Sequence, residues 1–207
     1  MRLERGTARD ARHACKCFHY SRSMPTASHI YNVFNDGGEW CGCIIYSPGA
    51  NNHIGSEYGL VQGQVLELVR VALNGRQGHG RTSQAVSASL RMLHADAPLC
   101  KLVISYADAG QGHYGTIYQA TNWLYVGERA GQGYVEVNGE RLHKKAATSR
   151  YGTCNIDEIR HQAGEGVRWV ESAGKRKYLY FFDKRLRKKF QHLSQPYPKR
   201  ETSTLPA

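Results

Sequence analysis

The sequence predicts an α/β (α+β) fold, with a central mixed sheet that contains a parallel or splayed pair of strands flanked by helices. Two mostly apolar segments, 64–74 and 99–107, have the length and the Val, Leu and Ile content of buried strands. Segment 82–93 between them carries apolar residues at i, i+4 and i+7, which indicates an amphipathic helix. The order strand, helix, strand is that of a crossover unit in one sheet.

The remaining segments indicate further strands, turns and a short helix. In chain order we expect irregular structure over 19–38, a strand over 40–48, a hairpin over 133–143, a loop over 145–153, a short helix over 155–164, and a last strand followed by a basic run over 175–192. The hairpin signal is the clearest, because the Asn-Gly pair at 138–139 tolerates the positive φ angles of a two-residue turn.

The length favours a single domain with terminal extensions. The chain has 207 residues, and most domains contain about 100–150. Residues 1–18 are polar and basic and are expected to be loose or weakly helical, 19–193 form the domain, and the proline-rich, polar end 194–207 is expected to be a flexible tail.

The charge indicates a polyanionic partner. The chain has 28 Lys and Arg against 17 Asp and Glu, a net charge of +11, which attracts phosphates at long range and favours double-stranded DNA as the macromolecular partner. Candidate DNA-binding residues are Arg22, Lys144, Lys145, Lys188 and Lys189. No apolar run approaches the ~20 residues that span a bilayer, so we expect a soluble, cytoplasmic protein. The oligomeric state stays open, a homodimer included.

The six cysteines are expected to be thiols, because the N-terminus has no apolar signal core. Two pairs have C-x-C spacing, and four thiolates can bind zinc, although structural zinc sites usually space their ligands more widely. The pair Cys41 and Cys43 also fits a strand with both thiols on one face.

The loop NGRQGHG that precedes the predicted helix 82–93 has the composition of an anion site. Gly78 and Gly80 let the backbone approach a phosphate, unpaired NH groups at a helix N-terminus favour negative charge, and Arg76 and Arg81 add positive charge. The alternative is a glycine-rich connector with ordinary surface arginines. The loop matches neither the P-loop pattern nor the dinucleotide pattern.

The stretch 104–123 contains a further candidate site. Asp108 ends the predicted strand 99–107, and Tyr118 lies in the first turn of the helix that follows. Ligands of open α/β sheets gather where strands end, which favours a site at this edge. The alternatives are that Asp108 is a turn or cap residue and that Tyr118 packs under the sheet.

The segments ELVRVAL, GRQGHG and SQAVSASL together resemble the signature of GNAT-type acyltransferases. In that family a Q/R-x-x-G-x-G/A loop holds the pyrophosphate of an acyl-coenzyme A. Gly78 and Gly80 fall on the motif, whereas Gly75 stands where Gln or Arg is expected. The resemblance implies a GNAT-like fold and acetyl-coenzyme A, or another acyl-coenzyme A, held by Arg76, Gly78, Gly80 and Arg81.

Four separate blocks, HYSRSMPT, ELVRVAL, SYAD and GHYGTIYQATNWLYVG, resemble the Mom family of phage DNA-modification proteins in the same order. The resemblance implies conversion of adenine in double-stranded DNA to a carbamoylmethyl derivative at its exocyclic amine, which protects phage DNA from host restriction. The implied catalytic residues are Asp108, Tyr118, His19, Tyr20 and Arg70. The implied ligands of an iron ion are His19, Tyr20, Asp108 and Tyr118.

The substrate chemistry suggests roles for these residues. The exocyclic nitrogen of adenine is a poor nucleophile, so a catalyst must remove a proton, polarise the electrophile, or both. Asp108 is a candidate base, His19 a rival base, and Tyr118 a proton donor to a departing thiolate. The base must also leave the stack, and the aromatic residues available for stacking are Tyr31, Tyr114, Trp123 and Tyr125, with a place in the core as the alternative for Trp123 and Tyr125.

Two other function classes remain open from the residues alone. One is a catalytically silent DNA-binding protein that keeps the same fold and charge. The other is a general acetyl-coenzyme A-dependent N-acetyltransferase that acts on a protein or a small molecule. Altered adenine nucleosides distinguish the DNA modifier from both.

Overall fold

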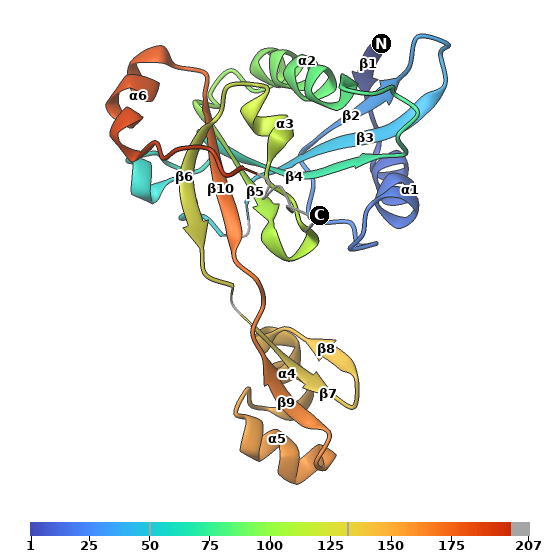
Figure 1. Ribbon diagram of the computed structural model, residues 1–207, viewed down its shortest axis with the longest axis vertical. Helices are drawn as coiled ribbons and strands as arrows, with labels where there is room; N and C mark the ends of the chain where they lie inside the picture. The colour runs from blue at the N-terminus through green and yellow to red at the C-terminus, as the bar shows by residue number, and fades with distance from the viewer. Residues whose placement is uncertain (50, 132, 200–207) are drawn as a thin grey trace, which may run out of the picture. The chain divides into compact units, whose positions relative to one another are not determined.

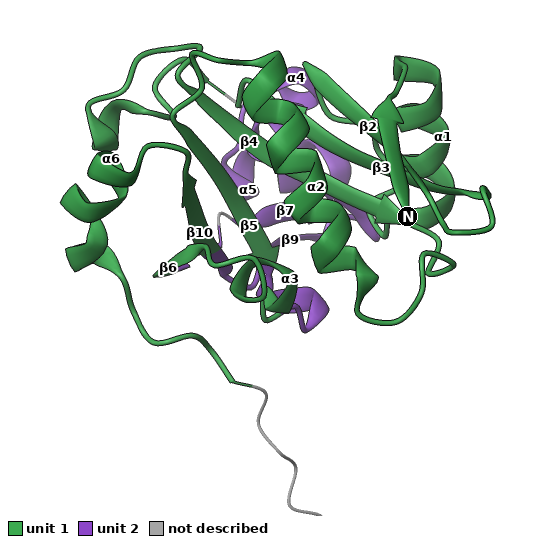
Figure 2. Ribbon diagram, turned by 90° about the horizontal axis from the view of Figure 1, so that it is seen from above, with its two compact units in different colours: residues 1–107, 114–127, 177–207 green, residues 108–113, 128–176 purple. Residues whose placement is uncertain are grey.

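The computed structural model describes residues 1–49, 51–131 and 133–199, and these form two compact units (Figure 2). The first unit comprises 1–107, 114–127 and 177–207, and the second comprises 108–113 and 128–176. The sequence predicted one domain over 19–193. The chain divides because residues 128–176 form a small sheet with its own apolar core.

A seven-stranded mixed sheet forms the centre of the first unit (Figure 1). Across the sheet, the strands are β1 (Arg2–Arg5), β2 (His29–Phe34), β3 (Trp40–Ser47), β4 (Val65–Leu73), β5 (Leu102–Asp108), β10 (Lys175–Phe181) and β6 (Leu124–Arg129). Strands β1 to β4 pair antiparallel, and β4 pairs parallel with β5. The predicted α/β class with a parallel pair and a crossover helix is therefore confirmed.

Helices cover both faces of this sheet. The crossover helix α2 (Arg81–Asp96) and the short α3 (Thr116–Gln119) pack on one face, through apolar residues such as Val86 and Leu90. Helix α1 (Ala8–Phe18) packs on the other face. The short helix α6 (Lys184–Lys189) and the 3-10 turns η1 (Ser56–Tyr58), η2 (Ala109–Gln111) and η3 (Gln191–Leu193) complete the set.

The N-terminal 18 residues are ordered elements, which corrects the expectation of a loose segment. β1 extends the sheet beside β2, and α1 begins with a capping box between Thr7 and Asp10. The buried side of α1 is made of Ala11, Ala14 and Cys15. Small residues let the helix lie close to the sheet, and this weakly apolar face is why the pattern was missed among the exposed basic residues. Strand β2 was also missed within 19–38.

The parallel strands β4 and β5 diverge, as the prediction of a splayed pair allowed. Their pairing runs from Val65↔Leu102 to Leu68↔Ser105, although both strands continue beyond it. On the other side of β4, the register with β3 shifts between Ile45 and Tyr46, which leaves Val69 as an extra residue in β4. Such a bulge bends its strand, so the pairing with β5 ends where the bulge begins.

The second unit holds strands β7 (Tyr134–Val137), β8 (Glu140–Leu142) and β9 (Val167–Val170) in the order β8-β7-β9, with helices α4 (Lys144–Tyr151) and α5 (Ile156–Ala163). The hairpin at Asn138-Gly139 is confirmed, with φ angles of 50° and 85°. The short helix that ends at Gly164 is also confirmed. Residues 145–153 are mostly helix α4, where a loop was expected.

The first residues of the expected flexible tail are held by hydrogen bonds. Gln195 and Tyr197 donate hydrogen bonds to the carbonyls of Tyr125 and Trp123, while residues 200–207 of the expected tail lie outside the described part.

Cys41 and Cys43 do not share a face. They lie in separate apolar clusters, because Gly42 between them has a φ of 123° and interrupts the alternation. Every cysteine is a free thiol.

Candidate active site

The fork between β4 and β5 is occupied by hydroxyl groups. Ser105 Oγ lies 2.8 Å from the carbonyl oxygen of Leu68, across the last paired position, and 2.8 Å from the hydroxyl oxygen of Tyr118. A serine hydroxyl has one proton to donate. The Ser105 hydroxyl can therefore donate to either the Leu68 carbonyl or the Tyr118 hydroxyl oxygen, and the contact with Tyr118 holds the phenol at the point where the strands separate.

Tyr118 reaches the fork from α3 and is nearly buried, with 7% of its surface exposed. Its ring packs against Trp123 and Tyr178 at centroid distances of 5.0 and 5.1 Å. Burial raises the pKa of Tyr118 to about 12, although the hydrogen bond with Ser105 lowers it. The phenol is therefore neutral near pH 7 and can act as a proton donor.

Two further side chains lie close enough to Tyr118 to act on it electrostatically. Tyr20 and Glu67 both raise the pKa of Tyr118. Tyr20 is 51% exposed, so it presents an aromatic ring to solvent beside a buried phenol. Of the residues that the resemblance implied, Tyr20 and Tyr118 therefore interact electrostatically, and Glu67 from β4 acts on the same phenol.

His19 stands beside Tyr20 in the turn after α1. Their rings are 4.3 Å apart, and His19 Nδ1 accepts a hydrogen bond from the Ser21 backbone NH at 3.2 Å. An Nδ1 that accepts a backbone proton carries no proton of its own, which places the ring proton of a neutral imidazole on Nε2. His19 is thus oriented by its own turn and supports the ring of Tyr20.

Arg70 lies on β4 just after the bulge. Its Nη1 donates to the Val69 carbonyl at 2.8 Å, and its charge opposes the effect of burial on the pKa of the Cys15 thiol in α1. Its Nε is buried and has no hydrogen-bond partner among the residues that the structure describes. A guanidinium with an unused buried donor next to the fork is suited to bind an oxygen of a substrate.

Asp108 belongs to the second unit, where it ends β5. Its carboxylate accepts a hydrogen bond from the backbone NH of Gly110 at 3.0 Å and so caps η2, and its carbonyl accepts from the NH of His113. The carboxylate thus has the cap function that the sequence left as an alternative.

The glycine-rich loop forms the N-terminus of α2, as its sequence suggested. Gly78 and Gly80 have φ angles of 97° and 72°, and Gly80 is the N-cap residue. The guanidinium of Arg81 is bound to Asp36 at 2.6 Å, so part of its charge is already neutralised. Gln77 is nearly buried, and its Oε1 has no hydrogen-bond partner within the described residues. This helix start can hold an anion through backbone NH groups.

The charge of the chain lies on the first unit. The second unit holds nine Lys and Arg against eight Asp and Glu, while the first holds 19 against nine, so the net charges are +1 and +10. Lys144 and Lys145 lie on α4 of the nearly neutral second unit, and the Lys144 ammonium is over the ring of Trp169. Lys188 and Lys189 lie on α6.

The side chains proposed for base stacking are mostly part of the core. Tyr31 and Trp123 are 1% and 0% exposed, and Tyr125 is also buried. These three residues pack in one apolar cluster and have no face available for a nucleotide. Tyr114 is partly exposed, and Tyr20, at 51% exposed, presents the more open ring to a base.

The donor set that the resemblance implies for iron does not fit the structure. Tyr118 retains its proton at neutral pH and is engaged with Ser105, the imidazole Nδ1 of His19 is engaged with its own turn, and Asp108 lies in the other unit as a cap residue. Within residues 1–49, 51–131 and 133–199, no group of three or more His, Cys, Asp or Glu side chains is arranged to hold a metal ion. We therefore derive no step through iron or zinc.

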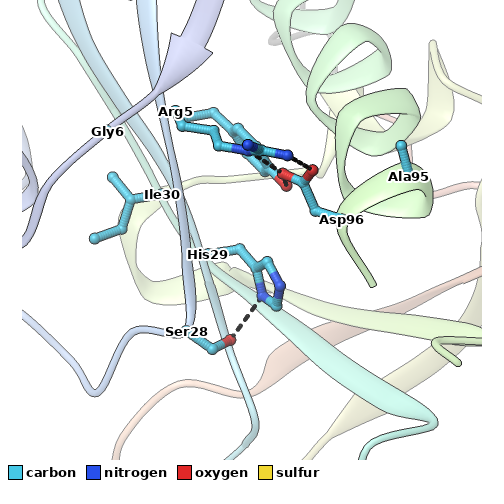
Figure 3. A pocket seen from close by; sticks show the side chains of 8 residues that line it. Arg5, Gly6, Ser28, His29, Ile30, Ala95 and Asp96 are labelled. Carbon is cyan, nitrogen blue, oxygen red and sulfur yellow. Dashed lines mark hydrogen bonds and ion pairs between the residues drawn. The ribbon is translucent and has the colours of Figure 1, made fainter. Parts of the chain in front are cut away.

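A pocket of about 430 Å³ lies between β1, β2 and the C-terminal end of α2 (Figure 3). The guanidinium of Arg5 donates to the Asp96 carboxylate at 3.2 and 2.5 Å, and the Tyr31 hydroxyl donates to it at 3.0 Å. These contacts, that with Arg5 first, hold the pKa of Asp96 below its usual range. Since its main charges neutralise each other, this pocket ties β1 to α2 and is not an anion site.

No helix in the described part of the chain is long and apolar enough to cross a membrane.

The comparisons with known proteins agree with the fold and identify the family. A model described as the Mom protein family matches residues 1–199. The chain belongs to the Mom family. It is 27% identical to the "Methylcarbamoylase mom" of Escherichia phage Mu in an alignment of 206 residues that covers 96% of this chain and 84% of that protein.

Solved structures show which fold this Mom-family chain has. A variant of the spermidine N-acetyltransferase SpeG of Vibrio cholerae matches with a TM-score of 0.50 and 10% identity, over 93% of this chain and 99% of that one. Another structure of the V. cholerae spermidine/spermine N-acetyltransferase SpeG has a TM-score of 0.50 and 7% identity, over 92% and 95%. The Mom-family protein therefore has the GNAT acetyltransferase fold, as its sequence predicted.

Sequence reasoning missed Ser105 and Glu67. Ser105 carried a visible signal, because it is a polar residue in the middle of an otherwise apolar strand. Glu67 carried a similar one in β4, but which face it occupies relative to Tyr118 depends on the divergence of the two strands.

Proposed function

We propose that this protein is a DNA-modification enzyme that attaches a carbamoylmethyl group to the exocyclic amine of adenine in double-stranded DNA, and that this protects phage DNA from host restriction. The observation that carries the proposal is the neutral phenol of Tyr118 at the β4–β5 fork, hydrogen-bonded to Ser105, in a chain of the Mom family. The positive first unit supports a DNA substrate.

The residues at the fork supply the acid and base functions that the reaction needs. As the carbamoylmethyl group passes from its donor, the bond between its methylene carbon and the adenine nitrogen forms while the bond from that carbon to the leaving group of the donor breaks, the amine loses one proton, and the leaving group takes up one. Glu67 is the proposed base for the amine, and Tyr118 the proposed acid for the leaving group. Support for this pairing is the electrostatic effect of Glu67, which raises the pKa of Tyr118.

Arg70, Tyr20 and His19 are proposed to bind the reactants. The buried, unused Nε of Arg70 suits a carbonyl or carboxylate oxygen. The exposed ring of Tyr20, supported by His19, suits an adenine that has left the DNA stack. Asp108 is proposed as a further carboxylate of the site, at the end of β5.

We propose an acyl-coenzyme A, such as acetyl-coenzyme A, as a ligand of the helix start at Gly78 and Gly80. Support comes from the fold and from the positive φ angles that leave the backbone accessible to a pyrophosphate. The contribution of Arg76 and of the backbone NH of Arg81 is part of this proposal.

The test is nucleoside mass spectrometry on plasmid DNA from cells that co-express the protein. We expect adenine nucleosides heavier by a carbamoylmethyl substituent, and a large loss of this product with Tyr118→Phe. Unmodified adenine in samples with abundant folded protein contradicts the proposal. In that case, DNA binding without modification identifies a silent binder, and turnover of acetyl-coenzyme A with amines, indifferent to DNA, identifies a general N-acetyltransferase.

A further inference from the structure

Helix α1 has a strongly positive outer face. Arg9, Arg12, His13 and Lys16 are all exposed and recur at three- and four-residue spacing, so they form one stripe along the helix. The opposite side is buried on the sheet. In an 11-residue helix, the span from Arg9 to Lys16 is ~10 Å at 1.5 Å per residue.

The stripe borders a groove of about 650 Å³ that β2 and β3 complete with Asn32, Phe34 and Trp40. The indole of Trp40 lies 5.6 Å from the ring of His13, which gives the groove an aromatic wall beside its positive one. The one carboxylate that lines the groove belongs to Asp10, which accepts hydrogen bonds from Thr7 and Asn32. These hydrogen bonds lower the pKa of Asp10.

The positive charges of the stripe are not tied up in ion pairs among the described residues, although Arg9 acts electrostatically on Asp10. None of Arg9, Arg12 and Lys16 forms a salt bridge within the part of the chain that the structure describes. By contrast, Arg5 and Arg81 elsewhere in the first unit are paired with Asp96 and Asp36.

We propose that the outer face of α1 binds the phosphodiester backbone of duplex DNA and so places the target nucleotide at the fork. This inference rests on the proposed function for its substrate. The span of ~10 Å covers about three nucleotides of one strand at ~3.4 Å each. Helix α1 ends at Phe18, and His19 and the exposed Tyr20 follow immediately, so a strand that tracks along α1 arrives at the Tyr20 ring.

The other basic helix of the first unit, α6, is a poorer candidate, although its Lys188 and Lys189 were predicted to bind DNA. Figure 1 shows α1 and α6 at opposite ends of the sheet. Helix α6 has six residues, its Arg187 is bound to the carbonyl of Asn122, and its Lys189 lies over Phe190. Being far from Tyr20, it cannot contact the same few nucleotides.

A charge-matched pair of variants tests the inference. Arg12→Ala/Lys16→Ala removes two charges from α1, and Lys184→Ala/Arg185→Ala removes two exposed charges from α6. Alanine is the best helix former, so both helices should persist, which circular dichroism and thermal melting verify. The measurement is the Kd for a fluorescent DNA duplex by anisotropy over a series of KCl concentrations.

For the α1 variant we expect at least tenfold weaker binding near 0.1 M salt. We also expect its slope of log K against log salt to be smaller by ~1.8, since each lost phosphate contact contributes ~0.9. The α6 variant should change the Kd less than threefold. Equal weakening by both variants, an unaffected α1 variant, or a larger effect from α6 overturns the inference. Equally tight binding of the wild type to anionic lipid vesicles overturns its DNA specificity.

Adenine modification is measured separately on co-expressed plasmid, so the two proposals can fail independently. Loss of DNA binding in the α1 variant supports the surface even if the wild type leaves adenine unmodified. Full adenine modification by the α1 variant overturns the surface and leaves the proposed function intact.

Discussion

The hydroxyl oxygen of Tyr118 lies 2.8 Å from Ser105 Oγ, at the position where β4 and β5 cease to pair. The bulge at Val69 bends β4 away from β5, and the opening is filled by a phenol that burial keeps neutral. The position where the two strands stop pairing is therefore also the position of the proposed proton donor, and most tests of the proposed function concern residues there.

Tyr118→Phe removes the hydroxyl and keeps the ring contacts with Trp123 and Tyr178. We expect modified adenine to fall by ~100-fold or more, as for other general acids, while the free energy of unfolding changes by ~1 kcal/mol. Nucleoside mass spectrometry and denaturant unfolding measure the two effects. Unchanged modification would show that another group protonates the leaving group.

Ser105→Ala tests a positioning residue, because Ser105 contacts the acid and not the reactants. The variant leaves a buried phenol without its hydrogen-bond partner, which costs ~1–3 kcal/mol of stability. Since the Ser105 hydrogen bond lowers the pKa of Tyr118, its loss should raise that pKa and reduce the modification rate. Ser105→Thr keeps a hydroxyl and should restore both the stability and the modification rate. Equal losses in the Ala and Thr variants would show that Ser105 acts through packing alone.

Alkaline pH should destabilise the fold through Tyr118. Its pKa is about 12 in the folded chain against 10 for an ordinary tyrosine. The contribution of the buried neutral phenol to the free energy of unfolding is therefore fully present below pH ~10 and is lost as pH rises towards 12. The shift corresponds to about 3 kcal/mol at most. Melting temperatures between pH 8 and 12 should fall less steeply for Tyr118→Phe than for the wild type. Parallel curves contradict the expectation.

Tyr20→Phe and Tyr20→Ala separate stacking from hydroxyl chemistry. The side chain is 51% exposed, so neither change should alter the free energy of unfolding by more than ~0.5 kcal/mol. If the ring stacks on a displaced adenine, Phe should retain modification and Ala should reduce it at least tenfold, as a stacking contribution of ~1–3 kcal/mol implies. Loss with Phe as well would assign a role to the phenol oxygen.

Asp108→Asn distinguishes a carboxylate role from a cap. An amide oxygen can still accept the hydrogen bond from Gly110, so the end of β5 should keep its structure and stability. We expect modification to fall because the negative charge is lost. Wild-type amounts of modified adenine in the Asn variant, together with a loss in Asp108→Gly, would reduce Asp108 to a structural residue.

The strands and helices predicted most accurately were those with strong local signals. The apolar runs 64–74 and 99–107 correspond to β4 and β5, and the Asn138-Gly139 turn is where it was expected. By contrast, β1 was missed, and α1 was anticipated only as one alternative for a loose or weakly helical segment. The buried face of α1 consists of Ala11, Ala14 and Cys15, and such small side chains hardly register in a hydrophobic pattern.

Sequence alone determined the α/β class, the family resemblance, the positive charge, and the positions of Asp108 at a strand end and Tyr118 in the next helix, because these depend on local periodicity and motifs. Only the tertiary structure decided that Ser105 and Glu67 join Tyr118, that Tyr31 and Trp123 are core, and that the charge lies on the first unit. Such relationships depend on where two strands stop pairing and which faces helices bury, and both are set by contacts between residues far apart in the chain.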